Sequence, residues 1–494
     1  MSSYKYIGVP KVISSKECAE NGFVFAPSKY SRFIPNGNVL FVPLSKICRE
    51  SKVKITFNRR EMYQYSEIGD IDVSTGTIKS NTLYGLHLPS ENPKIVKKND
   101  ILVSTVRSYR GGFGLMNSDA DNICCSPAIL VIRNVSKKIT KEYLLAVLRT
   151  DFTIEQILGF QTRGMYPRLD SDAMDKLLIP IPKDKKIIKY ISDLMRAYLN
   201  KNELIKQRHA EILRLIDEEL RNNQKESTDT YHFPTLQELQ KVGRLDTGLY
   251  SKRFWIQNAK IKNYKNGYTS FLKLNNGNVN ITRGQNLQES NIGKSIYEDS
   301  PRKGFYRLAL SKNFTDSQTI VQYQYLGNPR KLKTISMGEI IFSCRGDMGR
   351  NLVYCEPIDD IITNIDSVHI VFPQQKLYKT IFISQFLGYL RTISYLKTIA
   401  ITGSGADSFT KYQFELLSIP NFPDSKQQEI AKLYHNPQEY KSGDCTLDHF
   451  LAFDDNYNAT AGIYELDKTA KYLQQLLNQA IDDIVNNREV KIKF

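Results

Sequence analysis

The sequence contains few of the residue types on which most enzymes and metal sites depend. Its 494 residues include seven scattered cysteines and no Cys-x-x-Cys pair, so neither a disulfide framework nor a zinc site is indicated. Only six histidines are present, and no His-Glu-x-x-His motif occurs, which argues against a metallopeptidase or a histidine-based triad. A Gly-x-x-x-x-Gly-Lys-Ser/Thr loop is also missing, which excludes a P-loop nucleotide site.

Other catalytic and membrane signals are equally absent. The Asn/Asp-Pro-Pro-Tyr/Phe motif of amino-methyltransferases does not occur, and the glycine cluster at 111–114 fits a plain turn better than a phosphate cradle. There is neither a run of about 18 apolar residues nor a basic-then-apolar opening stretch. We therefore expect a binding protein of the reducing cytoplasm, without a membrane segment, rather than a catalyst.

The charge balance favours a polyanionic partner. The formal net charge is +16 and the isoelectric point is about 9.2, which is typical of proteins that bind nucleic acid. The basic residues are dispersed, so solubility alone is an alternative explanation. Twenty-nine tyrosines suit a surface that contacts sugars, phosphates and bases, but they also suit an AT-rich genome.

The chain carries an internal repeat. The strand-like run 99–107, which contains Ser104, is echoed by 338–345, which contains Ser343, at an offset of 239 positions. The Ile-Pro pairs ending at Pro180 and Pro420 lie 240 positions apart. A repeat this long indicates two copies of a domain, and their divergence indicates that they bind different things. We also align Gly69 with Gly284, which places an insertion of the second copy in the loop-like stretch 323–333.

Two stretches have the apolar spacing of long helices. The seam of residues 183–223 is Ile191, Leu194, Tyr198, Ile205, Ile212 and Ile216, and that of residues 463–488 is Leu466, Ala470, Leu473, Leu477, Ala480 and Ile484. Spacings of three and four are typical of helices packed on each other, so we expect an antiparallel pair. A helix of roughly 36 residues is about 54 Å long. The alternative is that each helix packs only on its own globular unit.

The expected fold class is therefore α/β, with two tandem globular domains separated and joined by long antiparallel coiled-coil helices. Shorter helices are predicted at 142–158 and 382–396. The predicted organisation is a first target-recognition domain at 1–182, a spacer helix at 183–223, a linker at 224–232, a second target-recognition domain at 233–423, an irregular connection at 424–462 and a second spacer helix at 463–488.

The order of these features resembles the DNA-specificity subunit of type I restriction-modification systems. In the first copy, the similar residues are Asp100 to Arg107, Gly164 to Leu169 and Leu178 to Pro182; in the second copy they are Arg244-Leu245-Asp246 with Tyr250 and Phe254, then Gly338 to Ser343 and Ile419-Pro420. The chain departs from the family pattern in three places, one of which is the segment 434–462, which interrupts the link to the last helix. The first copy lacks Arg-Leu-Asp before Tyr30, and the second has Gly403 to Asp407 in place of Gly-x-Tyr-Pro-Arg.

The resemblance implies that each domain reads one half of a bipartite double-stranded DNA target, while the helices fix the spacer between the halves. It implies as partners two DNA adenine-N6 methyltransferase (modification) subunits, which carry S-adenosylmethionine, and a restriction or translocase subunit that can join them. It implies no cofactor, no metal and no catalytic residue in this chain.

Reading a base edge requires side-chain donors and acceptors that reach it, for which arginine, glutamine and asparagine are best suited. The DNA-binding candidates are Arg107, Ser108, Arg110, Arg163, Tyr166, Arg168, Arg283, Gln285, Asn286, Arg345, Arg350, Ser404 and Lys411. For each, a surface salt bridge or plain solvation is the alternative. Ser104 and Ser343 are expected to be structural, because they lie inside strands.

Three rival interpretations stay open. The first is the specificity subunit of a related phage-defence methylation system without a translocating nuclease. The second is a nuclease fused to recognition domains, although the repeats and helices leave no room for a catalytic domain. The third is a protein-interaction scaffold, which predicts no salt-dependent DNA binding.

Overall fold

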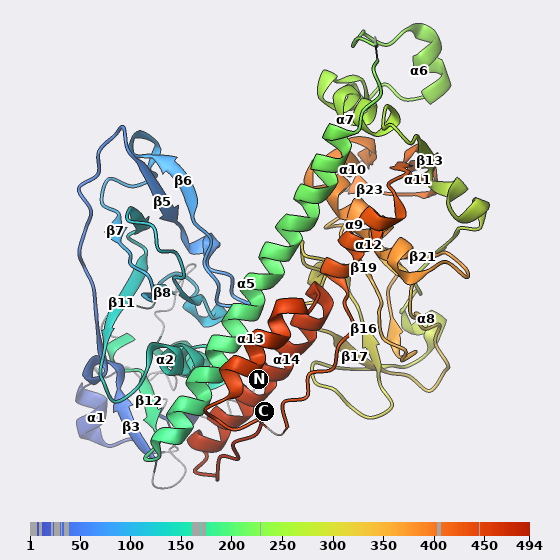
Figure 1. Ribbon diagram of the computed structural model, residues 1–494. Coiled ribbons are helices and arrows are strands. Elements are labelled where there is room, and N and C mark those ends of the chain that lie inside the picture. The colour runs from blue at the N-terminus through green and yellow to red at the C-terminus, as the bar shows by residue number, and fades with distance from the viewer. Residues whose placement is uncertain are drawn as a thin grey trace. The chain divides into compact units, whose positions relative to one another are not determined.

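The computed structural model describes residues 7–8, 12–20, 23, 30, 32–33, 39–160, 169, 174–227, 229–402, 407–443 and 445–494. They form two compact units (Figure 1). Unit 1 comprises the described residues within Met1–Glu203, Glu439–Ala459 and Lys468–Phe494, and unit 2 those within Leu204–Gln438 and Thr460–Asp467.

Unit 1 is built on two four-stranded sheets and a two-stranded ribbon. The first sheet has the order β4–β11–β8–β9 and is antiparallel; the second has the order β6–β5–β10–β7, with β5 and β10 parallel; the ribbon pairs β3 with β12. The strands are β3 (Leu40–Pro43), β4 (Cys48–Glu50), β5 (Met62–Ser66), β6 (Asn81–Tyr84), β7 (Lys94–Ile95), β8 (Ile101–Ser104), β9 (Phe113–Leu115), β10 (Ile123–Cys125), β11 (Ile129–Val135) and β12 (Leu178–Ile181).

Strand β8 is the centre of this unit because both of its faces are covered. All four of its residues are buried, as expected for a β-branched, apolar run inside a sheet. Ile101 and Val103 belong to one hydrophobic core, which includes Tyr143, and Leu102 belongs to another with Met116. This alternation follows from the two-residue period of a strand.

Unit 2 repeats this plan. Its sheets are β14–β21–β18–β19 and β15–β17–β16–β20, with β16 and β20 parallel, and its ribbon pairs β13 with β24. The strands are β13 (Tyr268–Ser270), β14 (Asn280–Arg283), β15 (Ile296–Glu298), β16 (Tyr306–Leu308), β17 (Gln324–Gly327), β18 (Ile340–Ser343), β19 (Asn351–Val353), β20 (Ile361–Ile362), β21 (Ser367–Val371) and β24 (Ser418–Pro420).

The strand order confirms the duplication, with β7 and β15 as the strands without a counterpart strand, but one alignment anchor is wrong. Gly284 directly follows β14, which occupies the position of β4, whereas Gly69 lies in a 3-10 helix, Ile68–Asp70. The stretch 323–333 is not an inserted loop, since it contains β17, the counterpart of β6. The additional strand of unit 2 is β15. A lone glycine motif is too unspecific to fix an alignment.

The shorter helices also differ from their predicted bounds. The stretch 142–158 forms two helices, α2 (Lys141–Leu148) and α3 (Asp151–Phe160), and unit 2 has α9 (Leu377–Thr392) followed by α10 (Tyr395–Ile399). Thr150 and Asp151 are residue types favoured at helix starts, which explains the restart. The apolar spacing continues across the break, so the sequence pattern hides it.

The two long helices are present as α5 (Lys185–Asn222) and α14 (Ile463–Val485). All twelve predicted seam residues are buried. In unit 1 the first half of α5 shares one core with the later part of α14. Tyr190, near the start of α5, donates a hydrogen bond to the Lys493 carbonyl beyond the end of α14, and its ring lies 5.3 Å from that of Phe494. The helices therefore run in opposite directions there.

The connection at 424–462 is not irregular. It contains α12 (Asp424–Tyr434) and α13 (Phe450–Thr460). The buried positions of α13 include Asp454 and Asn458, which contact the Lys201 ammonium of α5 at 2.7 and 2.6 Å. Lys201 is fully buried. Because α13 buries polar residues at helical spacing, the apolar pattern that would have predicted it is missing.

The remaining described elements flank these cores. They are β1 (Ile7–Gly8), α1 (Ser15–Glu20), β2 (Arg32–Phe33), α6 (Leu236–Val242), α7 (Lys252–Lys262), α8 (Glu289–Ile292), β22 (Ile401–Thr402), β23 (Asp407–Ser408) and α11 (Lys411–Leu416). Within the described ranges, no helix has the length and apolar character needed to cross a bilayer.

Candidate nucleic-acid interface

The loop 105–112, which joins β8 to β9, carries three of the predicted residues. Ser104 fastens its start, because the hydroxyl donates to the Val106 carbonyl at 2.8 Å and the backbone N–H donates to the Gly112 carbonyl at 2.8 Å. Arg107 has left-handed backbone angles, φ 51° and ψ 39°, which are uncommon for a residue with a side chain. Arg110 is exposed, whereas Ser108 is buried and donates to the Thr105 carbonyl at 3.4 Å.

The loop 344–350, which joins β18 to β19, is fastened in the same way. The Ser343 hydroxyl donates to the Arg345 carbonyl at 2.9 Å, and its N–H donates to the Arg350 carbonyl at 2.8 Å. Ser104 and Ser343 are thus structural, as predicted. Gly346 has a φ of +68° and lies 239 positions after Arg107. One copy therefore has glycine where the other holds an arginine in the same backbone region.

Each of these loops pairs with the segment that leads towards the Ile-Pro strand. In unit 1 the Leu169 N–H donates to the Thr105 carbonyl at 2.9 Å. In unit 2 the Phe409 N–H donates to the Cys344 carbonyl at 3.1 Å. The candidates shortly before Leu169 and Phe409 lie outside the described residues; they are Arg163, Tyr166, Arg168 and Ser404.

Two arginines of unit 2 lie at the same end of the strands of its first sheet. Arg283 ends β14 and Arg345 follows β18, and both side chains are exposed. Both act on the Cys344 thiol between them: burial raises its pKa to about 12, and the two guanidinium groups oppose that rise. Among the described residues, neither arginine forms an ion pair. The two guanidinium groups therefore place positive charge at this end of the sheet.

Other predicted residues already hold contacts inside the unit. The Gln285 amide donates to the Lys333 carbonyl and accepts from its N–H, at 2.8 and 3.1 Å. The Asn286 amide bonds to Gln288. To reach DNA, either side chain would first have to give up these bonds. Lys411, by contrast, is the exposed first residue of α11.

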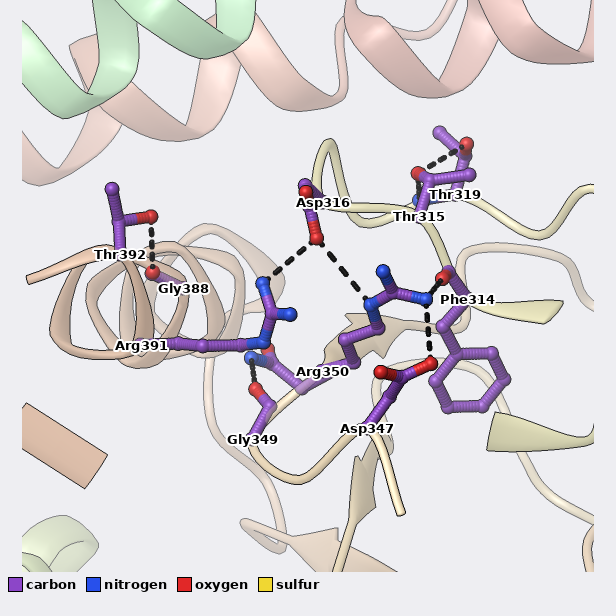
Figure 2. Close-up of polar contacts among 11 residues, drawn as sticks. Phe314, Thr315, Asp316, Thr319, Asp347, Gly349, Arg350, Gly388, Arg391 and Thr392 are labelled. Atoms are coloured by element: carbon purple, nitrogen blue, oxygen red, sulfur yellow. Dashed lines mark hydrogen bonds and ion pairs between the residues drawn. The ribbon is translucent and has the colours of Figure 1, made fainter. Parts of the chain in front are cut away.

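Arg350 is engaged most strongly (Figure 2). Its Nη1 donates to the Phe314 carbonyl at 2.7 Å and to Asp347 at 3.1 Å, and its Nε lies 3.3 Å from Asp316. Asp316 also accepts from Arg391 at 2.8 Å. Arg350 therefore supports the 344–350 loop from within.

Sequence reasoning missed Arg149 and Arg391, which end the first helix beside each loop. Arg149 is the C-cap of α2, and Arg391 lies in the last turn of α9. A sequence signal for them exists: Leu148-Arg149-Thr150 and Leu390-Arg391-Thr392 are identical tripeptides 242 positions apart. Their offset is close to the 239 and 240 positions of the other repeat anchors.

Part of the chain matches a known protein family. Residues 42–214 match the family model described as the type I restriction modification DNA specificity domain. The match covers 173 of the 494 residues of the chain. The specificity domain so defined contains the loop 105–112 and the first part of α5.

One curated protein is similar to part of this chain. The chain is 28% identical over 142 residues to the type I restriction enzyme HindI specificity subunit of Haemophilus influenzae (strain ATCC 51907 / DSM 11121 / KW20 / Rd), a match that spans 27% of this chain and 30% of that protein.

Solved structures include the HsdS subunit from Thermoanaerobacter tengcongensis, at 17% identity and a TM-score of 0.32, covering 91% of this chain and 97% of that one. The type I S subunit from M. genitalium is 13% identical with a TM-score of 0.35, at the same two coverages. TM-scores of this size do not by themselves establish a shared arrangement.

Proposed function

We propose that this chain is a DNA specificity subunit that reads a bipartite sequence, one part with each unit, and forms no bonds itself. The observation that carries the proposal is the duplicated site. In both units a loop fastened by a strand serine pairs with the segment that leads to the Ile-Pro strand. Two related but divergent sites on one chain suit a target with two different halves.

The chemistry of the two sites supports reading of DNA. Arg110, Arg283, Arg345 and Lys411 are exposed, and the chain has a net charge of +16. Arginine is the residue best suited to bidentate recognition of guanine, and cations near phosphates provide the salt-dependent part of affinity. Of the groups in the described ranges, no set of three or more His, Cys, Asp or Glu side chains is arranged to hold a metal.

The partners follow from this proposal. We infer two modification subunits that bind S-adenosylmethionine and methylate adenine at N6, with the paired helices α5 and α14 as their platform and as the element that sets the spacing of the half-sites. A restriction subunit that joins them would make the assembly a nuclease as well.

The test is affinity purification of the tagged chain from its native host, combined with a genome-wide map of methylated adenines. The expected result is co-purification of a methyltransferase and one split motif that disappears when the gene for this chain is deleted. An unchanged methylation map in the deletion strain would contradict the proposal. Cleavage of DNA by the purified chain with Mg²⁺ alone would favour the fused nuclease instead.

A further inference from the structure

In unit 1 the guanidinium group of Arg149 joins two backbone segments. Nη1 donates to the Phe113 carbonyl at 3.0 Å, and Nη2 donates to the Val73 and Ser74 carbonyls at 3.1 and 2.9 Å. Phe113 directly follows the loop 105–112, and the other two residues belong to the turn 72–77. One side chain therefore fastens the end of the loop to a neighbouring turn.

The turn is shaped to receive this side chain. Gly76 has a φ of +75°, and a Cβ there would lie 2.8 Å from Nη1 of Arg149. The Gly76 carbonyl in turn accepts from the Leu115 N–H of β9 at 3.1 Å. The turn 72–77, β9 and Arg149 thus form one connected unit beside the loop.

Unit 2 contains the corresponding contacts. Arg391 donates to Asp316 at 2.8 Å (Figure 2), and Asp316 lies in the turn 315–319, which occupies the place of the turn 72–77. A Cβ on Gly349, in the loop 344–350, would lie 3.5 Å from the side-chain methylenes of Arg391. Here too an arginine at the end of a helix contacts the turn, and it shares Asp316 with Arg350 of the loop.

A second bond strengthens the connection in unit 2. The amide of Gln318, in the same turn, donates to Asn351 Oδ1 at 2.8 Å, and Asn351 directly follows the loop. Ser384 of α9 donates to the same oxygen at 2.7 Å. All three side chains are buried. The Asn351 oxygen accepts from both the turn and α9, while Oε1 of Gln318 is buried without a hydrogen-bond partner among the described residues.

Both turns also face the long helix α5. In unit 1 the Tyr198 hydroxyl, on α5, donates to the Ser74 carbonyl at 2.9 Å, so Arg149 and Tyr198 share one acceptor. In unit 2 a cavity of about 650 Å³ is lined by His209 and Leu213 of α5 together with Asp316, Arg391 and the loop residues 346–348. Each clamp therefore lies between the spacer helix and the loop of its own unit.

We propose that Arg149 and Arg391 are positioning residues for sequence reading, each holding the base-reading loop of its unit in register with α5. The inference rests on the proposed function, since it assumes that these loops read DNA. Base discrimination depends on donors placed within hydrogen-bonding distance, and supporting residues set that placement to within about 0.5 Å. Because the guanidinium fork presents several donors in one plane, lysine cannot reproduce the three contacts of Arg149.

The test uses the complete complex with its modification subunits and duplexes that carry single-base changes in one half-site or the other. The variants are Arg149→Lys and Arg391→Lys. Arg133→Lys and Arg307→Lys are matched controls, because these half-buried arginines pair with Asp100 and with Asp360 rather than with a loop. Melting temperature and non-specific binding are measured for each variant.

We expect Arg149→Lys and Arg391→Lys each to lower discrimination at a different half-site by about tenfold or more. Discrimination at the other half-site and the salt-dependent binding should stay as in the wild type. The control variants should lower the melting temperature without a change at either half-site. Two milder variants, Tyr198→Phe and Asp316→Asn, should give smaller losses at the half-sites of units 1 and 2, even if the lysine variants do not fold.

The outcomes separate the two levels of the argument. The wild-type complex is expected to show a split preference. If both lysine variants, or both milder variants, keep that preference in full, the positioning role is refuted and the proposed function is not affected. Equal losses at both half-sites, matched by the control variants, would assign these arginines a merely structural role. A wild-type complex with no split preference would refute the proposed function itself.

Discussion

Replacing Arg107 with glycine should separate folding from DNA reading. Arg107 has a φ of 51°, in the left-handed region, and its counterpart in unit 2 is Gly346, with a φ of 68°. The backbone therefore already favours glycine at position 107. For the backbone, arginine is therefore less favourable than glycine at this position.

The magnitude follows from a comparison of Arg107→Gly with Arg107→Ala, since both variants lose the same guanidinium group. The left-handed region costs a residue with a Cβ about 1–2 kcal/mol, and the greater freedom of glycine in the unfolded chain offsets about 0.5–1 kcal/mol of that. Arg107→Gly should thus be more stable than Arg107→Ala by roughly 0.5–1 kcal/mol. For a unit of this size, that is a difference in melting temperature of about 1–4 °C.

Both variants should lose reading of the same half-site. One bidentate contact to a base contributes about 1–3 kcal/mol of discrimination, which corresponds to about 5–150-fold in the affinity ratio. Scanning calorimetry of the two variants and competition binding with duplexes altered in either half-site measure both effects. If Arg107→Ala were as stable as Arg107→Gly, the left-handed backbone conformation at position 107 would be contradicted. If both variants discriminated like the wild type, Arg107 would not read DNA.

Three further predictions concern other parts of the chain. Lys201→Met leaves the buried carboxylate of Asp454 without its cation and should destabilise unit 1 by about 3–5 kcal/mol, and adding Asp454→Leu should recover most of this in calorimetry. Burial lowers the pKa of His369 from 6.5 to about 4, so the unfolded state binds a proton at a higher pH than the folded state. The free energy of unfolding of unit 2 should therefore fall as the pH drops from 6.5 to about 4. The variant His369→Gln should reduce this dependence on pH. Lys411→Ala should weaken binding to all sequences alike and lower the slope of log affinity against log salt by about 1; an unchanged slope would exclude a phosphate contact.

The sequence predicts the architecture well where the pattern is apolar and periodic. The twelve seam residues of α5 and α14 are buried as expected, because a stripe at spacings of three and four must be covered by another surface. The repeat is detectable through Ser104 and Ser343, since a strand serine that bonds two residues onward shapes the loop that follows. These signals depend on residues that are close together in the sequence, so they can be detected in a single sequence.

Features that depend on contacts distant in sequence could not be predicted. The helix α13 buries Asp454 and Asn458 against Lys201, about 250 positions earlier, and no local pattern indicates such a partner. For the same reason Gln285 appears in the sequence as a free amide, whereas the structure places it on Lys333. The Leu-Arg-Thr repeat was detectable in the sequence, but its role as a clamp depends on backbone oxygens that only the fold brings near.

The clamp of unit 1 has a consequence for how recognition changes over evolutionary time. Arg149 donates hydrogen bonds to the main-chain oxygens of Val73 and Ser74, and every amino acid carries such an oxygen. The Val73 side chain is 47% exposed. A mutation at position 73 changes the side chain next to the loop 105–112 and keeps the main-chain oxygen that Arg149 binds. In unit 2 the acceptor is the side-chain carboxylate of Asp316, so a substitution at this position of the turn removes the contact with Arg391. New target preferences should therefore arise more readily in the N-terminal half of the chain.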